Sequence, residues 1–250
     1  MNYSYVTAAG AGAKDGTSWA NAYGWAEFDT YMVTGDVNAE TIFMMGGETY
    51  TLTSGFFPSN QNKRIVGVKP GTTAEPATPD DYAFDVSDRP EWSQGNNKVN
   101  MNIGGSAYCQ LLSISFDQAN PNYGVYVWAS NTITHCDITY ANTGGSAYMA
   151  ANLNSNSTFD LKIVMENGGG GNYPIYSTGQ ARYYYCYFEN KSTTATKLVY
   201  CKDHTAFTKT VFVGNSTATM EGIDGDGNSR NIAFIGCIFY NLTVGVSAGE

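Results

Sequence analysis

A short apolar pattern returns along residues 111–246 at nearly constant intervals. In each copy, a large apolar residue is followed three positions later by a small or apolar residue, and five positions later by a second large one. The last positions of the copies are Phe116, Ile138, Met165, Phe188, Phe212 and Phe239, so the steps are 22, 27, 23, 24 and 27 residues. Self-similarity at a period of this size predicts a solenoid, in which each repeat forms one coil of a continuous core.

The middle position of the pattern is often cysteine. Five cysteines stand at positions 109, 136, 186, 201 and 237, and they form no CxxC pair. Cys136, Cys186 and Cys237 share the middle position two coils apart, roughly 9–10 Å at the spacing of stacked strands, which is too far for a disulfide. They are expected to be small buried core residues. The copy at 160–165 is imperfect, because Asp160 falls where the first apolar residue should be.

Composition favours β structure and argues against nucleic-acid binding. Charged residues make up only 14% of the 250 residues, whereas there are 28 Gly and 19 Tyr, a balance typical of strands joined by many turns. The formal net charge of −9 disfavours contact with nucleic acid or an anionic membrane. No apolar run reaches membrane-spanning length, and residues 1–5 lack the start of a signal peptide. These features fit a virus-particle component and also a secreted protein whose leader has been removed.

The N-terminal part carries turn and strand signals in a fixed order. Residues 15–22 (DGTSWANA), a short helix, the pair Gly35-Asp36, an Ile-containing strand and residues 47–50 (GETY) follow one another. This order resembles the N-terminal cap and first coil of right-handed parallel β-helix proteins of the pectin-lyase-like class. The later Ile-x-x-Cys-x-Ile and Phe-x-x-Cys-x-Phe coils are similar to that class too. The resemblance spans most of the chain and implies an all-β, right-handed parallel β-helix with a short N-terminal capping helix.

The first two segments of this β-helix are the cap and the first coil. Residues 1–35 are expected to form the cap, with Thr17 or Ser18 capping a helix that ends at about Val33. Residues 36–71 are expected to form the first coil.

The next segment breaks the periodicity. Residues 72–100 are rich in turn and breaker signals, which predicts a lateral loop. Its aromatic residues Tyr82, Phe84 and Trp92 are expected to fold it back onto the body. Residues 101–250 are expected to form the remaining coils. No C-terminal cap follows them, and we expect this chain to be part of a longer one.

The residue before the last position of each copy is expected to face away from the core. In the later coils these residues are apolar and would form one external row of Val164, Tyr187, Val211 and Ile238. A contiguous external apolar patch usually marks an interface. Two interpretations stay open: a loop of the chain covers the row, or copies of the chain meet there in a homo-oligomer, most naturally a trimer.

One neighbourhood gathers several titratable residues. Aligning Val199 with Ile223 places Lys202 beneath Asp226. The candidate catalytic residues there are Asp203, His204, Asp224 and Asp226. Paired carboxylates with a histidine could serve acid–base cleavage of a sugar polymer. The alternative is a surface ion pair between Lys202 and Asp226, with turn carboxylates that accept bonds from backbone amides.

The chain also carries signals for metal and sugar binding. Residues 224–228 (DGDGN) are similar to a calcium loop, but Ser229 and Ile235 stand where an EF-hand needs Gly and Glu, so only a looser calcium site remains possible. Neither histidine has a metal-ligand spacing, and no other metal or cofactor is expected. The residues that could offer stacking faces to sugars are Tyr184, Tyr185 and Tyr187.

The functional expectation follows from these signals. The pectin-lyase-like class includes lyases, hydrolases, viral spikes and adhesins, and the catalytic motifs of its pectin-degrading members cannot be placed on this chain. We therefore expect a structural and interaction protein: a β-helical spike, fibre or adhesin on a virus particle or cell surface. It would assemble with itself or with other surface subunits and could bind glycans. The alternative is a polysaccharide lyase or glycoside hydrolase.

Overall fold

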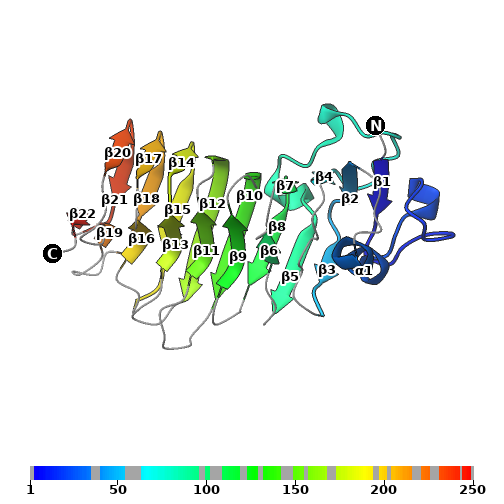
Figure 1. The fold of residues 1–250 in the computed structure, drawn as a ribbon, viewed down its shortest axis with the longest axis horizontal. Helices are drawn as coiled ribbons and strands as arrows, with labels where there is room; N and C mark the ends of the chain where they lie inside the picture. The colour runs from blue at the N-terminus through cyan, green and yellow to red at the C-terminus, as the bar shows by residue number, and fades with distance from the viewer. Residues whose placement is uncertain are drawn as a thin grey trace.

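The structure is a computed structural model of the chain. It describes residues 3–34, 40–53, 63–95, 99–101, 109–118, 123–128, 132–141, 149–154, 157–167, 173–193, 197–201, 204–215, 221–225, 231–242 and 244–248. These residues form a mostly β, parallel β-solenoid with one short α-helix near the N-terminus, as the repeat predicts. Figure 1 shows the strands stacked along the long axis, with α1 and β1 at one end and β20–β22 at the other. No helix in the described ranges is long and apolar enough to cross a membrane.

The strands stack on three faces, and every pairing between the named strands is parallel. The first face stacks β1 (Tyr3–Val6), β2 (Thr41–Met45), β4 (Lys63–Val68), β7 (Cys109–Leu112), β10 (Thr132–Ala141), β12 (Ser157–Asn167), β14 (Ala181–Tyr184), β17 (Thr205–Thr208) and β20 (Ile232–Ile235). The second face stacks β3 (Thr49–Thr51), β5 (Glu91–Gly95), β8 (Ser115–Gln118), the later halves of β10 and β12, β15 (Tyr187–Asn190), β18 (Val211–Val213) and β21 (Ile238–Tyr240). The third face stacks β6 (Val99–Met101), β9 (Tyr123–Trp128), β11 (Met149–Asn154), β13 (Tyr173–Thr178), β16 (Lys197–Cys201), β19 (Glu221–Gly225) and β22 (Val244–Ala248).

The register corrects one copy of the repeat. Ile138 pairs with Ile163, and Ile163 pairs with Phe188. The third copy is therefore made of Thr158, Leu161 and Ile163, two residues earlier than the apolar pattern predicts. The pattern was misleading because Thr158 is polar and yet fully buried, so the first core position has no apolar signal.

A single left-handed residue turns each later coil from the first face to the second. Its backbone angle φ lies between 48° and 62° in six successive coils, at Ser113, His135, Asp160, Tyr185, Lys209 and Gly236. We call these residues the bend row. Left-handed backbone is unfavourable for most side chains, by roughly 1–2 kcal/mol. The rung-to-rung bonding that continues through the bend stabilises it, because the amides of Tyr185 and Lys209 donate to carbonyls of the next coil at 2.9 and 2.7 Å.

Inside the later coils, the large positions of the repeat form aromatic stacks. Tyr183 stacks on Phe207 at 4.9 Å between ring centroids and Phe207 on Phe234 at 5.5 Å, with rings within 10° of parallel. Phe212 stacks on Phe239 in the same way, at 4.9 Å. The two stacks meet edge to face, as between Phe207 and Phe212. Both arrangements are favourable aromatic geometries, so one coil's core continues into the next.

The middle position of the repeat lies on the inside of the bend. Cys136, Cys186 and Thr210 each donate a hydrogen bond to the carbonyl two residues earlier, at 3.3, 3.4 and 3.4 Å. A small side chain with one hydrogen-bond donor therefore fits the tight bend. Burial raises the pKa of the Cys136 and Cys186 thiols to about 12, so both remain protonated donors at neutral pH. The expectation of buried, unbridged cysteines is confirmed for these two residues.

The helix begins later than predicted. Helix α1 spans Trp25–Thr34, whereas the capping signals favoured a start at Thr17 or Ser18. The residues before α1 instead bond to the edge of β1, because the amides of Tyr5 and Thr7 donate to the carbonyls of Gly16 and Tyr23 at 3.1 and 3.0 Å.

Helix α1 packs against the first coils of the core. The Trp25 ring lies 5.2 Å from Trp92 and 5.6 Å from Tyr50, and Phe28 is fully buried beside Trp25. The helix therefore covers apolar side chains at the N-terminal end of the solenoid, which is the role of a capping element.

The lateral loop is shorter than the predicted 72–100. Residues 91–95 form β5, which stacks between β3 and β8, and Trp92 is a fully buried core residue of that coil. Pro90 thus ends the loop. Tyr82 is buried and anchors the loop as predicted, while Phe84 is largely exposed. The short 3-10 turns are η1 (Trp19–Asn21), η2 (Pro79–Asp81) and η3 (Val86–Asp88).

Candidate functional site

The predicted catalytic cluster is only partly described. Val199 pairs with Ile223, which confirms the alignment used to predict it. Asp203 and Asp226 lie outside the described residues, as does Lys202. Asp224 lies in β19 on the third face, whereas His204 stands just before β17, where Asn231 approaches its ring nitrogen at 3.3 Å. The described members therefore do not establish a catalytic group.

The three predicted sugar-binding tyrosines lie on two faces. Tyr184 ends β14 on the first face, and Tyr185 is the exposed bend residue beside it. Tyr187 lies beyond the bend on the second face, where Lys162 approaches its ring at 5.9 Å and its hydroxyl donates to Glu189 at 3.1 Å. A single ligand on the first face could therefore contact only Tyr184 and Tyr185.

Phe159 completes an aromatic platform on the first face. Its ring stacks on Tyr184 from the next rung, with centroids 4.6 Å apart and planes 9° from parallel. Phe159 is 43% exposed, and Tyr185 next to the stack is 56% exposed. We call Phe159, Tyr184 and Tyr185 the aromatic platform. Sequence reasoning missed Phe159 because the two-residue register error placed it beside a core position rather than on the outside.

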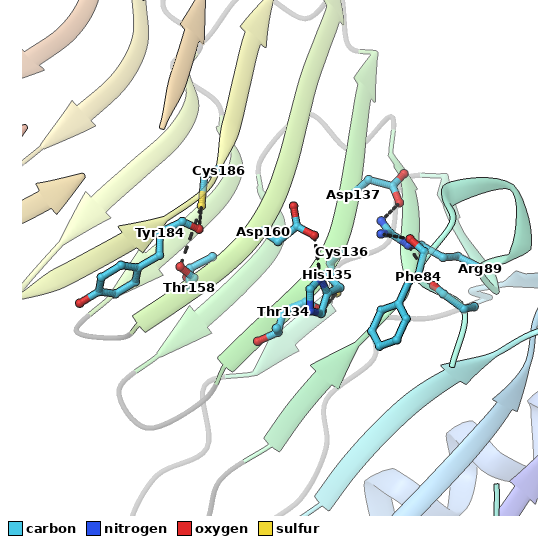
Figure 2. A network of polar contacts seen from close by, with 11 residues as sticks. Phe84, Arg89, Thr134, His135, Cys136, Asp137, Thr158, Asp160, Tyr184 and Cys186 are labelled. Carbon is cyan, nitrogen blue, oxygen red and sulfur yellow. Dashed lines mark hydrogen bonds and ion pairs between the residues drawn. The ribbon is translucent and has the colours of Figure 1, made fainter. Parts of the chain in front are cut away.

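The bend row carries charged groups along the edge of this platform. His135 Nδ1 lies 2.6 Å from a carboxylate oxygen of Asp160, and the Phe84 ring packs against the His135 ring. Figure 2 shows His135 on β10 facing Asp160 on β12, with Phe84 of the lateral loop beside His135. Further along, the Lys209 ammonium lies 5.3 Å from the centre of the Tyr185 ring, within the range of a cation–π contact.

A hollow of about 220 Å³ lies beside the platform on the first face. Ala206 and Ala233 line it together with Arg182, and His204 and Asn231 stand at its edge. Small side chains on two successive rungs create the space, because Arg182, Ala206 and Ala233 are paired neighbours in one outward row. The hollow thus combines an apolar floor with one cationic wall.

A second cleft, of about 370 Å³, lies where the lateral loop overhangs the second face. Arg89 is buried and donates from Nη1 to Asp137 Oδ1 at 2.8 Å and from Nη2 to the Phe84 carbonyl at 2.7 Å. Ser115 donates to the same Asp137 oxygen at 2.6 Å. These bonds, drawn in part in Figure 2, clamp the loop onto β10. Ser115 and Asp137 precede the apolar residues of the external row, so the loop covers this polar start of the row rather than its apolar end.

The remaining lining of this cleft consists of carboxylates and hydroxyls. Glu48 and Glu91 stand with Thr49 and Thr139 around the clamp. Glu91 and Asp137 occupy the same row two rungs apart, so their backbones are about 10 Å apart. Within the described ranges, no group of three His, Cys, Asp or Glu could hold a metal ion.

The corrected register also changes the predicted interface row. Lys162, not Val164, pairs with Tyr187, and the row continues through Val211 to Ile238. Val164 lies in the adjacent row and is buried, whereas Ile238 is 59% exposed. The apolar surface therefore lies nearer the C-terminal end than predicted, and its adjacent row adds the exposed Tyr240.

Comparison of the chain with protein-family models, with curated proteins and with solved structures found no match.

We expect the substitution Asp137→Ala to lower the free energy of unfolding by about 3 kcal/mol, because it leaves the Arg89 guanidinium buried without its carboxylate. Urea denaturation measures this loss, and limited proteolysis should show faster cleavage within residues 69–90. The control is Glu166→Ala, which removes an equally short but exposed ion pair with Lys191 and should cost less than about 1 kcal/mol. Equal effects of the two substitutions would show that the Arg89–Asp137 pair does not hold the loop.

Proposed function

We propose that this chain is a structural and interaction protein: a β-helical spike, fibre or adhesin of a virus particle or cell surface, which binds glycans on its first face. The proposal includes a relationship to the pectin-lyase-like class and a right-handed winding of the coils. The observation that carries it is the aromatic platform of Phe159, Tyr184 and Tyr185, which stands exposed on a rigid sheet.

Several features of the platform support sugar binding. Sugars present flat C–H faces together with hydroxyls, and aromatic rings beside polar groups match that combination. The platform residues lie on stacked strands and at their fixed bend rather than on a long loop, so their geometry changes little on binding. The adjacent hollow adds space for a ring, and Arg182, His204 and Asn231 add polar groups around it.

The substitution Phe159→Ala should weaken glycan binding by about five- to tenfold, since an aromatic contact contributes roughly 1 kcal/mol and 1.4 kcal/mol corresponds to tenfold. A glycan array followed by calorimetry on the best oligosaccharide measures the effect. The control is Phe84→Ala, which removes a similarly exposed ring from the lateral loop.

Two outcomes would contradict this proposal. Absence of any glycan binding would remove the sugar-binding function. Shorter products that appear during incubation with oligosaccharides and disappear in Glu91→Gln would instead favour the alternative, a glycoside hydrolase. The loop-covered cleft with Glu91 and Asp137 is the specific observation behind that alternative.

We further propose that copies of the chain associate through the apolar end of the second face, with a trimer as the expected state. Tyr187, Val211 and Ile238 align on three successive rungs, and Tyr240 beside them is 61% exposed. Contiguous exposed apolar side chains on a flat sheet favour burial against another subunit.

The substitution Val211→Lys should convert the trimer into monomers, because it places a charge at the centre of this apolar row. Light scattering coupled to size-exclusion chromatography measures the mass. The matched control is Thr208→Lys, which adds the same charge on the first face of the same coil and should leave the mass unchanged. A monodisperse wild-type monomer would contradict the association.

A further inference from the structure

The outward side chains of β17 are short, whereas in the row of Thr208 both neighbouring strands present long side chains. Ala206 and Thr208 are the outward residues of this rung, whereas the preceding rung presents Arg182 and Tyr184. The following rung presents the exposed Ile235 in the row of Tyr184 and Thr208. The hollow at Ala206 and Ala233 lies two residues earlier on the same strands. We call this part of the first face, from the hollow to the short Thr208 between Tyr184 and Ile235, the β17 groove.

The groove has the width of one ring. Phe159 and Tyr184 already stack at 4.6 Å across one rung, with the opposite face of Tyr184 turned toward Thr208. Tyr184 and Ile235 are two rungs apart, about 10 Å at the spacing of stacked strands. A ring over Thr208 would therefore lie one stacking distance from each neighbour and would extend the existing stack.

The charges beside the groove are positive, although the whole chain carries a net charge of −9. Arg182 lies two residues before Tyr184 on the same side of β14, and Lys209 follows Thr208 at the bend. Among the described residues, neither cation pairs with a carboxylate, and the nearby Asp160 contacts His135 instead. A cation retained beside an aromatic surface on an acidic protein favours an anionic ligand.

We infer that the β17 groove binds a sugar that carries an acidic group, with its ring between Tyr184 and Ile235 and its carboxylate or sulfate on Arg182. Arg182 and Tyr184 are about 7 Å apart along the strand, a span that one pyranose and its acidic substituent bridge. The guanidinium can hold a carboxylate or sulfate through two parallel hydrogen bonds, which neutral sugars cannot use fully. This inference rests on the proposed glycan binding and specifies its ligand class.

The test compares acidic sugars with their neutral counterparts on the full chain. A glycan array with uronic-acid, sialylated, sulfated and neutral oligosaccharides identifies the best acidic ligand. Calorimetry then compares this ligand with the same oligosaccharide after its carboxylates are reduced to alcohols or its sulfates are removed. We expect the neutral form to bind at least tenfold more weakly, and the difference to shrink as salt rises.

Two variants distinguish the loss of binding at the groove from the loss of the fold. Arg182→Gln should weaken acidic binding at least tenfold and neutral binding much less, whereas Arg64→Gln, the same substitution at β4 of the same face, should change neither. Thr208→Tyr should fill the groove, continue the Phe159–Tyr184 stack, keep or raise the melting temperature, and abolish binding of both forms.

The outcomes distinguish this inference from the proposed function. Equal affinity for the acidic and neutral forms, or an Arg182→Gln variant that binds like the wild type, overturns the inference while glycan binding stands. Binding that persists in a folded Thr208→Tyr variant also overturns it. No binding to any oligosaccharide overturns both.

Discussion

The rung-to-rung pairing of parallel strands is the constraint on which the rest of this structure depends. It aligns equivalent residues of successive coils at about 4.8 Å, so that any side chain repeated in the sequence becomes a continuous row in space. Inside, this alignment produces the aromatic stacks through Phe207 and Phe212. No coil could bury those rings alone, and each obtains its partners from the coils on either side.

The same alignment distributes function over the outside. The first face combines the aromatic platform with the β17 groove, and the second face runs from the loop-covered acidic cleft to the apolar end at Ile238. The left-handed bend row separates them, so that Tyr185 and Tyr187 face different surroundings despite being two residues apart. One coil can therefore present the proposed ligand-binding edge and the proposed association surface at once.

The sequence predicts the solenoid, its repeat and most of its core positions, because large apolar residues recur wherever a rung needs them. It does not predict the register at the rung where a buried polar residue replaces the large apolar residue of the repeat. Thr158 fills a core position with a polar side chain, and this one exception shifted the apparent repeat by two residues and placed Val164 in the wrong row. The cleft was missed for a different reason: Arg89 and Asp137 are 48 residues apart, and only the folded loop brings them to 2.8 Å.

The corrected register is the central claim, since the platform, the groove and the external row all follow from it. Engineered disulfides test it directly. Residues 162 and 187 are neighbours on adjacent rungs, about 5 Å apart, whereas 164 and 187 are offset by two residues and about 8 Å apart, beyond the reach of a disulfide. Under mild oxidation, K162C with Y187C should form a bridge in non-reducing peptide maps, and V164C with Y187C should not. A bridge in the second pair but not in the first would contradict this register.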